Sequence, residues 1–545
     1  MRRSWGRFLV VDGLIVAGWL TSVGAVVLHE RGGLLDGLSN PATSLGATLE
    51  AKEQWFGIYY QGQPIGFSHT MLVPEEHEGV PGVAVVDQGR LFFSLLGSPQ
   101  ELEVTARAFI DADWRLQLFS ASIHTTTQRL AWSGRRHGDA LLVTLTTPTS
   151  SVTKQLKDPT GSAFVSGLSS WAAFHRLRVG QSGRTWVLNP LALSPEAVYF
   201  TVRRSEDLGG RRTLVVESDV AGMTTTSWVT PEGEVIKETS PLGWELRQES
   251  RDNALAHLAH QHTTLDLLSA ASVPIDRILD DPERITRLTL LVQGMEEGSV
   301  AIQRPWQRVL PPERLADYQR TPPEGPWCIV QLDRPTSAQP SQRLPPTIQH
   351  YLQPSLFVES ADPRIIAKAN DIIGSRTDPW ERMQALEQWV YATLTKRFTI
   401  GLPSAVDILA TPTGDCHEHT VLFTALARSV GLPTRMVAGL VYQGGRFFYH
   451  AWPEVWMDQW SPHLAGAAEG SSSASRADHN APQGQTGPSG HSQVGGWLPT
   501  DPTLAQRIAD ATHLGLSEAE NESLITLGHF IGKLRVSVLS VEPAR

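Results

Sequence analysis

From about residue 52, the chain is a succession of short runs rich in β-branched and aromatic residues, separated by turn residues. Examples are ELEVTARAFID, WRLQLFSASI and ALLVTLTT, while EQWFGIYYQGQPIGFSHTML is typical of two strands around a Gln-Gly-Gln turn. Such runs predict antiparallel strands. We expect residues 52–272 to form an open or half-closed antiparallel β domain. Residues 273–355 hold two more strand-like runs and a proline-rich stretch, and predict a small β module or linker.

The pattern changes to helical spacing after residue 355. The segments DPRIIAKANDIIG and DPWERMQALEQWVYATL both begin with Asp-Pro, which is a favourable helix start. In the second segment, apolar residues recur at helical spacing and predict a face that packs in the core: Met383, Leu386, Trp389, Val390 and Leu394. These positions need no functional explanation.

The first 31 residues predict an uncleaved membrane anchor. Arg2, Arg3 and Arg7 precede an apolar stretch, residues 8–28, which is long enough to cross a bilayer as a helix of about 20 residues. Asp12 lies near one end of this stretch, where it can reach the headgroups. The arginines favour a cytoplasmic N-terminus, so the bulk of the chain is expected outside the membrane. In a bacterium this means a single-pass cell-membrane protein with its bulk in the periplasm, and residues 32–51 form a tether.

The composition of the chain argues against a nucleic-acid partner and against a disulfide-rich fold. The net charge is −10 and the lysines and arginines form no long run, so no nucleic-acid partner is expected. The two cysteines cannot make a disulfide framework. Cys328 lies in the apolar run PWCIVQL, which favours a buried small side chain, although a single disulfide to Cys416 remains an alternative.

A polar segment interrupts the C-terminal part of the chain. Residues 461–496 are rich in Ser, Gly, Ala and Pro and have few apolar residues. Such a segment cannot bury enough surface to offset the entropy lost on ordering. We expect a disordered insertion between two paired strands.

Cys416 has the surroundings of a reactive thiol. It stands in TGDCHEHT, at the start of a predicted helix, where free N–H groups and the helix dipole stabilise a thiolate. Gly414 permits a sharp turn into the helix. Downstream, two strands joined at a Gly-Gly turn carry His450, and the strand after the insertion leads to Asp501. If these strands pair, the three residues can act as nucleophile, base and orienting carboxylate.

These motifs carry a family resemblance. GDCHEHTVLFTALARSVGLPTRMVAGL, followed by YHAWPEVW and GWLPTDPT, is similar to the transglutaminase-like superfamily, here of a bacterial membrane-anchored type. The resemblance covers about residues 360–510. It implies an α+β, papain-like catalytic domain, which we place at residues 356–545, and the catalytic residues Cys416, His450 and Asp501. The insertion departs from the compact family pattern. The β domain, in contrast, only loosely resembles the curved sheet-and-helix domains of bacterial envelope carriers.

Other interpretations of the same residues remain. Cys416, His417, His419 and His450 could bind zinc, but two histidines two positions apart point to different sides of a helix. His419 could compete with His450 as the base, whereas Glu418 is expected to be structural. Trp452 and Tyr449 are expected to pack rather than to stack on a substrate.

The expected function is hydrolysis of amide bonds in peptides or proteins through a thioester acyl-enzyme, without a metal or cofactor. One alternative is a transamidase that cross-links envelope proteins. Another is a non-catalytic envelope scaffold whose β domain binds an envelope protein. The three residues alone do not distinguish hydrolysis from transamidation.

Overall fold

The computed structural model describes residues 51–544, apart from 158–176, 261–265, 267–270, 296–303, 336–341, 344–347, 398–402, 458–493, 519–529 and gaps of one to four residues elsewhere. The predicted anchor, nearly all of the predicted tether and most of the predicted insertion lie outside the described residues. Within the described part, no helix is long and apolar enough to cross a membrane.

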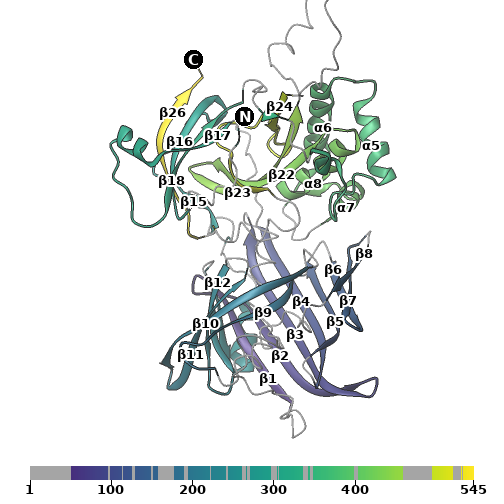
Figure 1. Ribbon diagram of the computed structural model, residues 1–545, viewed down its shortest axis with the longest axis vertical. Coiled ribbons are helices and arrows are strands. Elements are labelled where there is room, and N and C mark those ends of the chain that lie inside the picture. Colours follow the sequence, from purple (N-terminus) through teal and green to yellow (C-terminus); the bar gives the residue numbers. More distant parts are fainter. Residues whose placement is uncertain are drawn as a thin grey trace, which may run out of the picture.

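The described part of the chain is mostly β and contains one very large sheet, drawn in the lower half of Figure 1. Fourteen antiparallel strands form it. They are β1 (Lys52–Tyr60), β2 (Gln63–His77), β3 (Val80–Leu95), β4 (Ser98–Asp111), β5 (Leu116–Thr125), β6 (Arg129–His137), β7 (Ala140–Thr146), β8 (Ser151–Lys157), β9 (Ser182–Asn189), β10 (Ser194–Leu208), β11 (Arg211–Val220), β12 (Met223–Val229), β13 (Val235–Thr239) and β14 (Trp244–Glu249).

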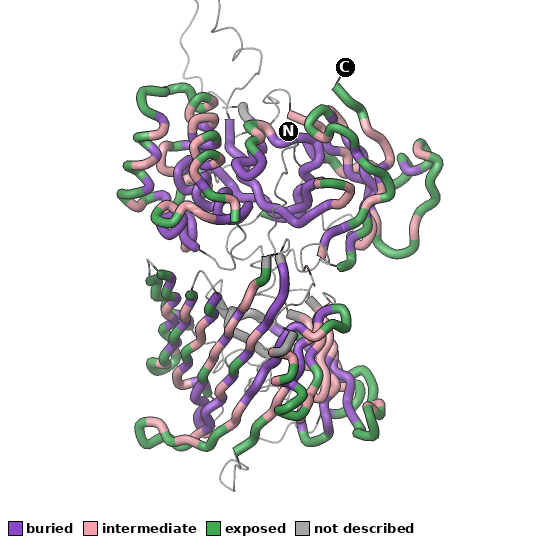
Figure 2. Tube along the Cα trace, turned by 180° about the vertical axis from the view of Figure 1, so that it is seen from behind, coloured by how far each residue is buried: buried purple, intermediate pink, exposed green. Residues whose placement is uncertain are grey.

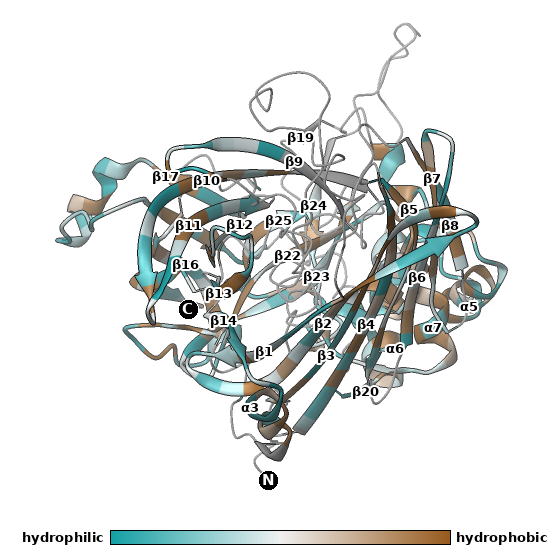
Figure 3. Cartoon of the chain, turned by 90° about the horizontal axis from the view of Figure 1, so that it is seen from below, coloured by the Kyte–Doolittle hydropathy of each residue, from teal (hydrophilic) through white to brown (hydrophobic). Residues whose placement is uncertain are grey.

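The sheet consists of two meanders joined through their first and last strands. Strands β8 back to β1 follow one another, and β14 to β9 continue from β1, with Trp55 opposite Glu249. Buried and exposed residues alternate along many of these strands, so one face packs in the core (Figure 2). Seen from below, the strands follow a curve rather than a plane (Figure 3). The predicted first turn is present, because Gln61 and Gly62 have φ values of 47° and 81° between β1 and β2.

Four helices and a second sheet build the C-terminal half, in the upper part of Figure 1. The helices are α5 (Pro363–Ile373), α6 (Pro379–Thr393), α7 (Ala405–Ala410) and α8 (Cys416–Ser429). The sheet has the order β19 (Gln342–Arg343), β24 (Val494–Pro499), β23 (Arg446–Met457), β22 (Thr434–Gln443) and β25 (Leu514–Glu518), with β15 (Val273–Pro274) also on β23. Helix α8 packs against β22 and β23.

Both Asp-Pro helix starts are confirmed. Asp362 caps α5 by accepting from the N–H of Arg364, and Asp378 caps α6 by accepting from the N–H of Glu381. The Gly-Gly turn between β22 and β23 is also confirmed, with φ values of 55° at Gly444 and 93° at Gly445. Strand β24 begins at Val494, so the last three residues of the predicted insertion belong to a strand instead.

The C-terminal end of the chain returns to the middle of the sequence. A third sheet has the order β17 (Gln307–Leu310), β18 (Trp327–Asp333), β16 (Ile285–Gln293) and β26 (Arg535–Pro543). Residues 535–543 fall within the predicted catalytic domain, but as strand β26 they pair with β16 over their whole length. The domain boundaries themselves stay predictions.

Short elements connect these sheets. They are α3 (Arg251–Ala256), the 3-10 helices η2 (His257–His260), η3 (Pro282–Arg284), η5 (Pro312–Tyr318) and η6 (Ile348–Leu352), and the parallel pair β20 (Thr395–Lys396) and β21 (Thr413–Gly414). Cys328 lies in β18 and is buried, as expected. Neither Cys328 nor Cys416 forms a disulfide, so the alternative of a bond between them is wrong.

Gly439 lets three strands approach closely beside His450. It pairs with His450 on one side and with Gly515 on the other. A Cβ atom on Gly439 would lie 2.1 Å from the backbone oxygen of Leu514 and 2.8 Å from the ring of Trp452. The backbone oxygen cannot move without disturbing the pairing of β22 with β25.

We therefore expect Gly439→Ala to lower the free energy of unfolding by about 2 kcal/mol or more. Ser120→Ala, at an exposed position of β5, is the control and should change it by less than about 0.5 kcal/mol. Denaturant unfolding followed by tryptophan fluorescence measures both. Equal unfolding midpoints for the two variants would show that the strands can separate at little cost.

Candidate active site

Cys416 is the first residue of α8, and its neighbours form a capping box. The carboxylate of Asp415 accepts from the N–H of His417 at 3.0 Å, and Glu418 accepts from the N–H of Asp415 at 2.8 Å. Glu418 is therefore part of the helix cap, in line with its expected structural role. Gly414 is required for space rather than for a turn, because a Cβ atom there would lie 2.4 Å from the Cβ of Glu418.

The thiol of Cys416 is fully buried against β23. The backbone N–H of Ala451, the residue after His450, donates to Sγ. Burial nevertheless raises the pKa of the thiol well above its ordinary value, and the charges of Asp415, Glu418 and Asp501 add to the increase. The expectation that the start of the helix lowers the pKa of the thiol is therefore wrong. In this environment the thiol needs a base.

His450 lies on β23, next to the residue that contacts the thiol. Its Nε2 is 2.7 Å from Oδ2 of Asp501, and its Nδ1 has no hydrogen-bond partner. Because the carboxylate accepts the Nε2 proton, a neutral His450 carries its lone pair on Nδ1. Asp501 does not lie opposite His450 in the strand ladder, since β24 ends at Pro499, which pairs with Glu454. It reaches His450 from the loop after β24.

The carboxylate of Asp501 is buried and accepts four hydrogen bonds. Oδ1 accepts from the N–H groups of Thr503 and Leu504 at 2.8 and 3.1 Å. Oδ2 accepts from His450 at 2.7 Å and from Nε2 of His513 at 3.2 Å. Burial alone raises the pKa of Asp501, but the two histidines outweigh it and hold the pKa well below its ordinary value. Asp501 is therefore an ionised, fixed acceptor.

His513 is a member of this cluster that the sequence analysis missed. It lies just before β25, and its Nδ1 is 3.2 Å from Oδ1 of Asp510. Burial lowers the pKa of His513, but hydrogen bonds to Asp501 and Asp510 outweigh it and raise the pKa to about 9. A possible signal was the DATH run, in which Asp510 precedes His513 by three residues. Nothing in that run indicates contact with Asp501.

His417 and His419 have different surroundings. Nδ1 of His419 is 2.5 Å from the backbone oxygen of Asp415, and its Nε2 has no hydrogen-bond partner. Burial lowers the pKa of His419 to about 4, and burial lowers the pKa of His417 as well. Neither ring has a hydrogen bond to a carboxylate among the contacts of the described residues. His419 thus lacks the orienting partner that His450 has.

The described residues contain one group with the composition of a metal site, and it differs from the set suggested by the sequence. His450, Asp501 and His513 place one possible ligand atom each within 4.8 Å of one another. Cys416, His417 and His419 are not part of this group. Within this group, His450 and His513 each contact Asp501 through a hydrogen bond from the ring to Oδ2.

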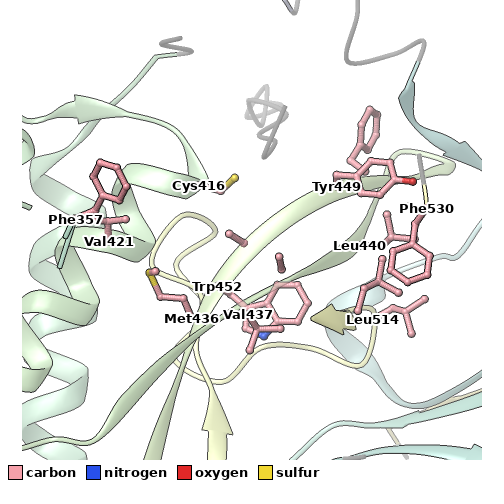
Figure 4. Packing of buried hydrophobic residues seen from close by; sticks show 14 of the residues in the cluster. Phe357, Cys416, Val421, Met436, Val437, Leu440, Tyr449, Trp452, Leu514 and Phe530 are labelled. Carbon is pink, nitrogen blue, oxygen red and sulfur yellow. The ribbon is translucent and has the colours of Figure 1, made fainter. Parts of the chain in front are cut away.

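Trp452 packs against both histidines of the cluster. The ring of Trp452 is stacked near His450, with centroids 6.1 Å apart, and meets His513 edge-on at 5.1 Å. Figure 4 shows Trp452 and Tyr449 of β23, Val437 of β22 and Cys416 in one group of buried side chains. Trp452 and Tyr449 thus pack in the core, as expected.

Two further ionisable groups, Glu387 of α6 and Lys396 of β20, interact electrostatically with Asp501. Burial raises the pKa of Glu387 to about 7, and burial lowers the pKa of Lys396 to about 8, while each also responds to Asp501.

A comparison with known protein families finds one match in this part of the chain. The sequence profile of the transglutaminase-like superfamily matches residues 366–464, which include Cys416 and His450 but end before Asp501 and His513. The C-terminal half of the chain therefore carries a transglutaminase-like domain. A comparison with curated proteins found no match.

Three solved structures show limited similarity. A protein from Cytophaga hutchinsonii, proposed to be a cysteine protease, is 14% identical, with 46% of this chain and 82% of that chain covered and a TM-score of 0.28. A DUF1089 family protein from Pseudomonas aeruginosa is 16% identical, with 38% and 94% covered and a TM-score of 0.18. A protein from Parabacteroides distasonis, proposed to be a protease, is 8% identical, with 66% and 62% covered and a TM-score of 0.16.

The raised pKa of His513 predicts a loss of stability in alkaline solution. Its folded pKa of about 9 exceeds the ordinary value of 6.5, so the stabilisation is complete below pH 6.5 and disappears as the pH rises through 9. The loss should be on the order of 3 kcal/mol. Denaturant unfolding at pH 6 and pH 10 measures it.

The control is the double variant Asp510→Asn with His513→Gln, which removes one buried charge of each sign and keeps the side-chain volumes similar. Other groups, such as Lys396, titrate equally in the wild-type protein and in the double variant. The difference between their profiles of unfolding free energy against pH therefore isolates His513. Parallel profiles would show that His513 is not charged in the folded protein.

Proposed function

We propose that this chain is a cysteine hydrolase that cleaves amide bonds of peptides or proteins through a thioester acyl-enzyme. The observation that carries the proposal is the arrangement of His450: Asp501 holds Nε2 at 2.7 Å, Nδ1 has no partner, and the next residue of the strand contacts the thiol of Cys416. In this proposal, Cys416 is the nucleophile, His450 the base and Asp501 the residue that orients the base.

The reaction starts from a protonated thiol, because burial raises the pKa of Cys416. Nδ1 of His450 accepts the thiol proton as Sγ forms a bond to the substrate carbonyl carbon. When the tetrahedral intermediate collapses, the C–N bond breaks and the imidazolium gives its proton to the leaving amine. Water then attacks the thioester with His450 again as base, and the products are a carboxylic acid and the free thiol.

The start of α8 offers a donor for the oxyanion. The N–H groups of Asp415 and His417 are already used in the capping box. We therefore assign the oxyanion to the N–H of Cys416 itself, at the positive end of the helix dipole.

Two other functions fit the same domain. In a transamidase, a primary amine replaces water in the second step and cross-links envelope proteins. In a non-catalytic scaffold, the large sheet binds an envelope protein and Cys416 has no turnover. The ordered His450–Asp501 pair favours chemistry, because a scaffold has no need of a buried ionised carboxylate, which is costly to maintain.

Incubating the full-length protein in detergent with a peptide library, with and without a fluorescent primary amine, separates these functions. We expect hydrolysed peptides, detected by mass spectrometry. Cys416→Ser should abolish product, His450→Ala should lower the rate by roughly 10²–10⁴-fold, and Asp501→Asn by less.

His419→Ala is the matched control. It removes another buried histidine, near the start of α8 where Cys416 lies, and should change the rate by less than about 10-fold. Incorporation of the amine that depends on Cys416 would favour the transamidase. No product that depends on Cys416 in either assay would favour the scaffold.

We also propose that the protein is anchored in the cell membrane by residues 8–28, with residues 50–545 on the extracytoplasmic side. The support is the apolar stretch behind Arg2, Arg3 and Arg7. Protease added outside spheroplasts should digest the bulk of the chain, whereas a cytoplasmic marker protein stays intact. Protection of residues 50–545 would contradict the proposed topology.

A further inference from the structure

His513 is held between two carboxylates in the core of the transglutaminase-like domain. Its Nε2 lies 3.2 Å from Oδ2 of Asp501, and its Nδ1 lies 3.2 Å from Oδ1 of Asp510. The His513 side chain has no exposed surface. An ionised carboxylate can only accept hydrogen bonds, and a neutral imidazole has a single N–H. Two carboxylate partners on opposite ring nitrogens therefore require the doubly protonated ring.

The surroundings fix both carboxylates. Asp510 accepts from the N–H of Thr512 at 2.8 Å, from its hydroxyl at 2.6 Å, and from the side chain of Gln506 at 2.8 Å. The backbone of Gln506 in turn exchanges hydrogen bonds of 2.8 and 3.0 Å with the backbone of Asp501. The loop between β24 and β25 thus forms a closed network in which neither carboxylate can rotate away from His513.

We propose that His513, held by Asp510, is a positioning residue of the active site: a buried imidazolium that fixes Asp501 against His450 and offsets the negative charge behind the base. This inference rests on the proposed function of Cys416 and His450. His513 does not contact the thiol, and it acts through the oxygen of Asp501 that it shares with His450. A raised pKa of about 9 keeps the ring charged at neutral pH.

The charge of His513 determines how readily the site loses a proton. Asp501 and Asp510 face it from its own loop, and His450 lies beside it on β23, with ring centroids 6.0 Å apart. Four other ionisable groups interact electrostatically with Asp501. They are Cys416 and His419 of α8, Glu387 of α6 and Lys396 of β20. A cation at His513 makes the first proton loss from the Cys416–His450 pair easier. The site should therefore work at lower pH than it would with a neutral residue there.

The charge state is tested directly by NMR. Full-length protein with ¹⁵N-labelled histidine, in detergent micelles, is followed from pH 6 to pH 10, and His513 is assigned by the signals lost in His513→Gln. Both ring nitrogens of His513 should carry protons at pH 7.5, and the ring should lose one of these protons near pH 9. His417 and His419 are internal controls and should be neutral at pH 7.5, because burial lowers the pKa of each. A single protonated nitrogen on His513 at pH 7.5 would overturn the inference.

The positioning role is tested by the pH profile of Cys416 alkylation with iodoacetamide, mapped by mass spectrometry and normalised to its own maximum. His513→Gln should move the acidic limb of the profile to higher pH by roughly half a unit or more. The double variant Asp510→Asn with His513→Gln should move it in the same direction by less, and it preserves the buried charge balance if the single variant does not fold. Unchanged profiles in both variants would reduce His513 to a structural role and overturn the inference.

The two proposals fail in different ways. If His450→Ala leaves the alkylation profile of Cys416 unchanged, the proposed function is wrong, whatever the NMR result. If His450→Ala alters the profile but neither His513 variant does, the proposed function stands and the role of His513 is refuted.

Discussion

The candidate active site depends on one buried carboxylate. Asp501 is removed from solvent, and a charge in that position is tolerated only because four donors surround it. Two of these donors are backbone N–H groups of its own loop, and the other two are the imidazole rings of His450 on β23 and of His513 just before β25. The same contacts that stabilise the charge therefore determine where His450 points and which of its nitrogens is left for chemistry.

At Cys416, burial decides between electrostatic effects that change the pKa of the thiol in opposite directions. The N-terminus of α8 favours an anion at Cys416, but the helix is capped by Asp415 and Glu418, whose charges have the opposite effect. Burial and the two carboxylates together raise the pKa of the thiol, so the thiol stays protonated. In the proposed mechanism, the nucleophile forms only when His450 removes the thiol proton, so the geometry of His450 matters more than the helix dipole.

The wider fold holds this region through long-range contacts. Glu454, on the same strand as His450, forms buried ion pairs with Arg304 at 2.8 Å and with Arg435 at 2.7 Å. Arg304 belongs to the segment before β17, whereas β26 pairs with β16 from the far end of the chain. Breaking one partner of such a buried network leaves an uncompensated charge and is costly. The third sheet is thereby tied to the transglutaminase-like domain.

The sequence by itself determined the local features of the protein. Asp-Pro helix starts, the Gly-Gly turn, the helix behind Cys416 and the strand of His450 follow from residues close together in the chain, because caps and turns are local hydrogen-bonding problems. Tertiary structure alone decided the rest. The pairing of β26 with β16, the approach of Asp501 from a loop and the position of His513 join residues that no local pattern connects. The pKa of Cys416 was likewise decided by burial, since desolvation depends on what the folded chain packs around a side chain.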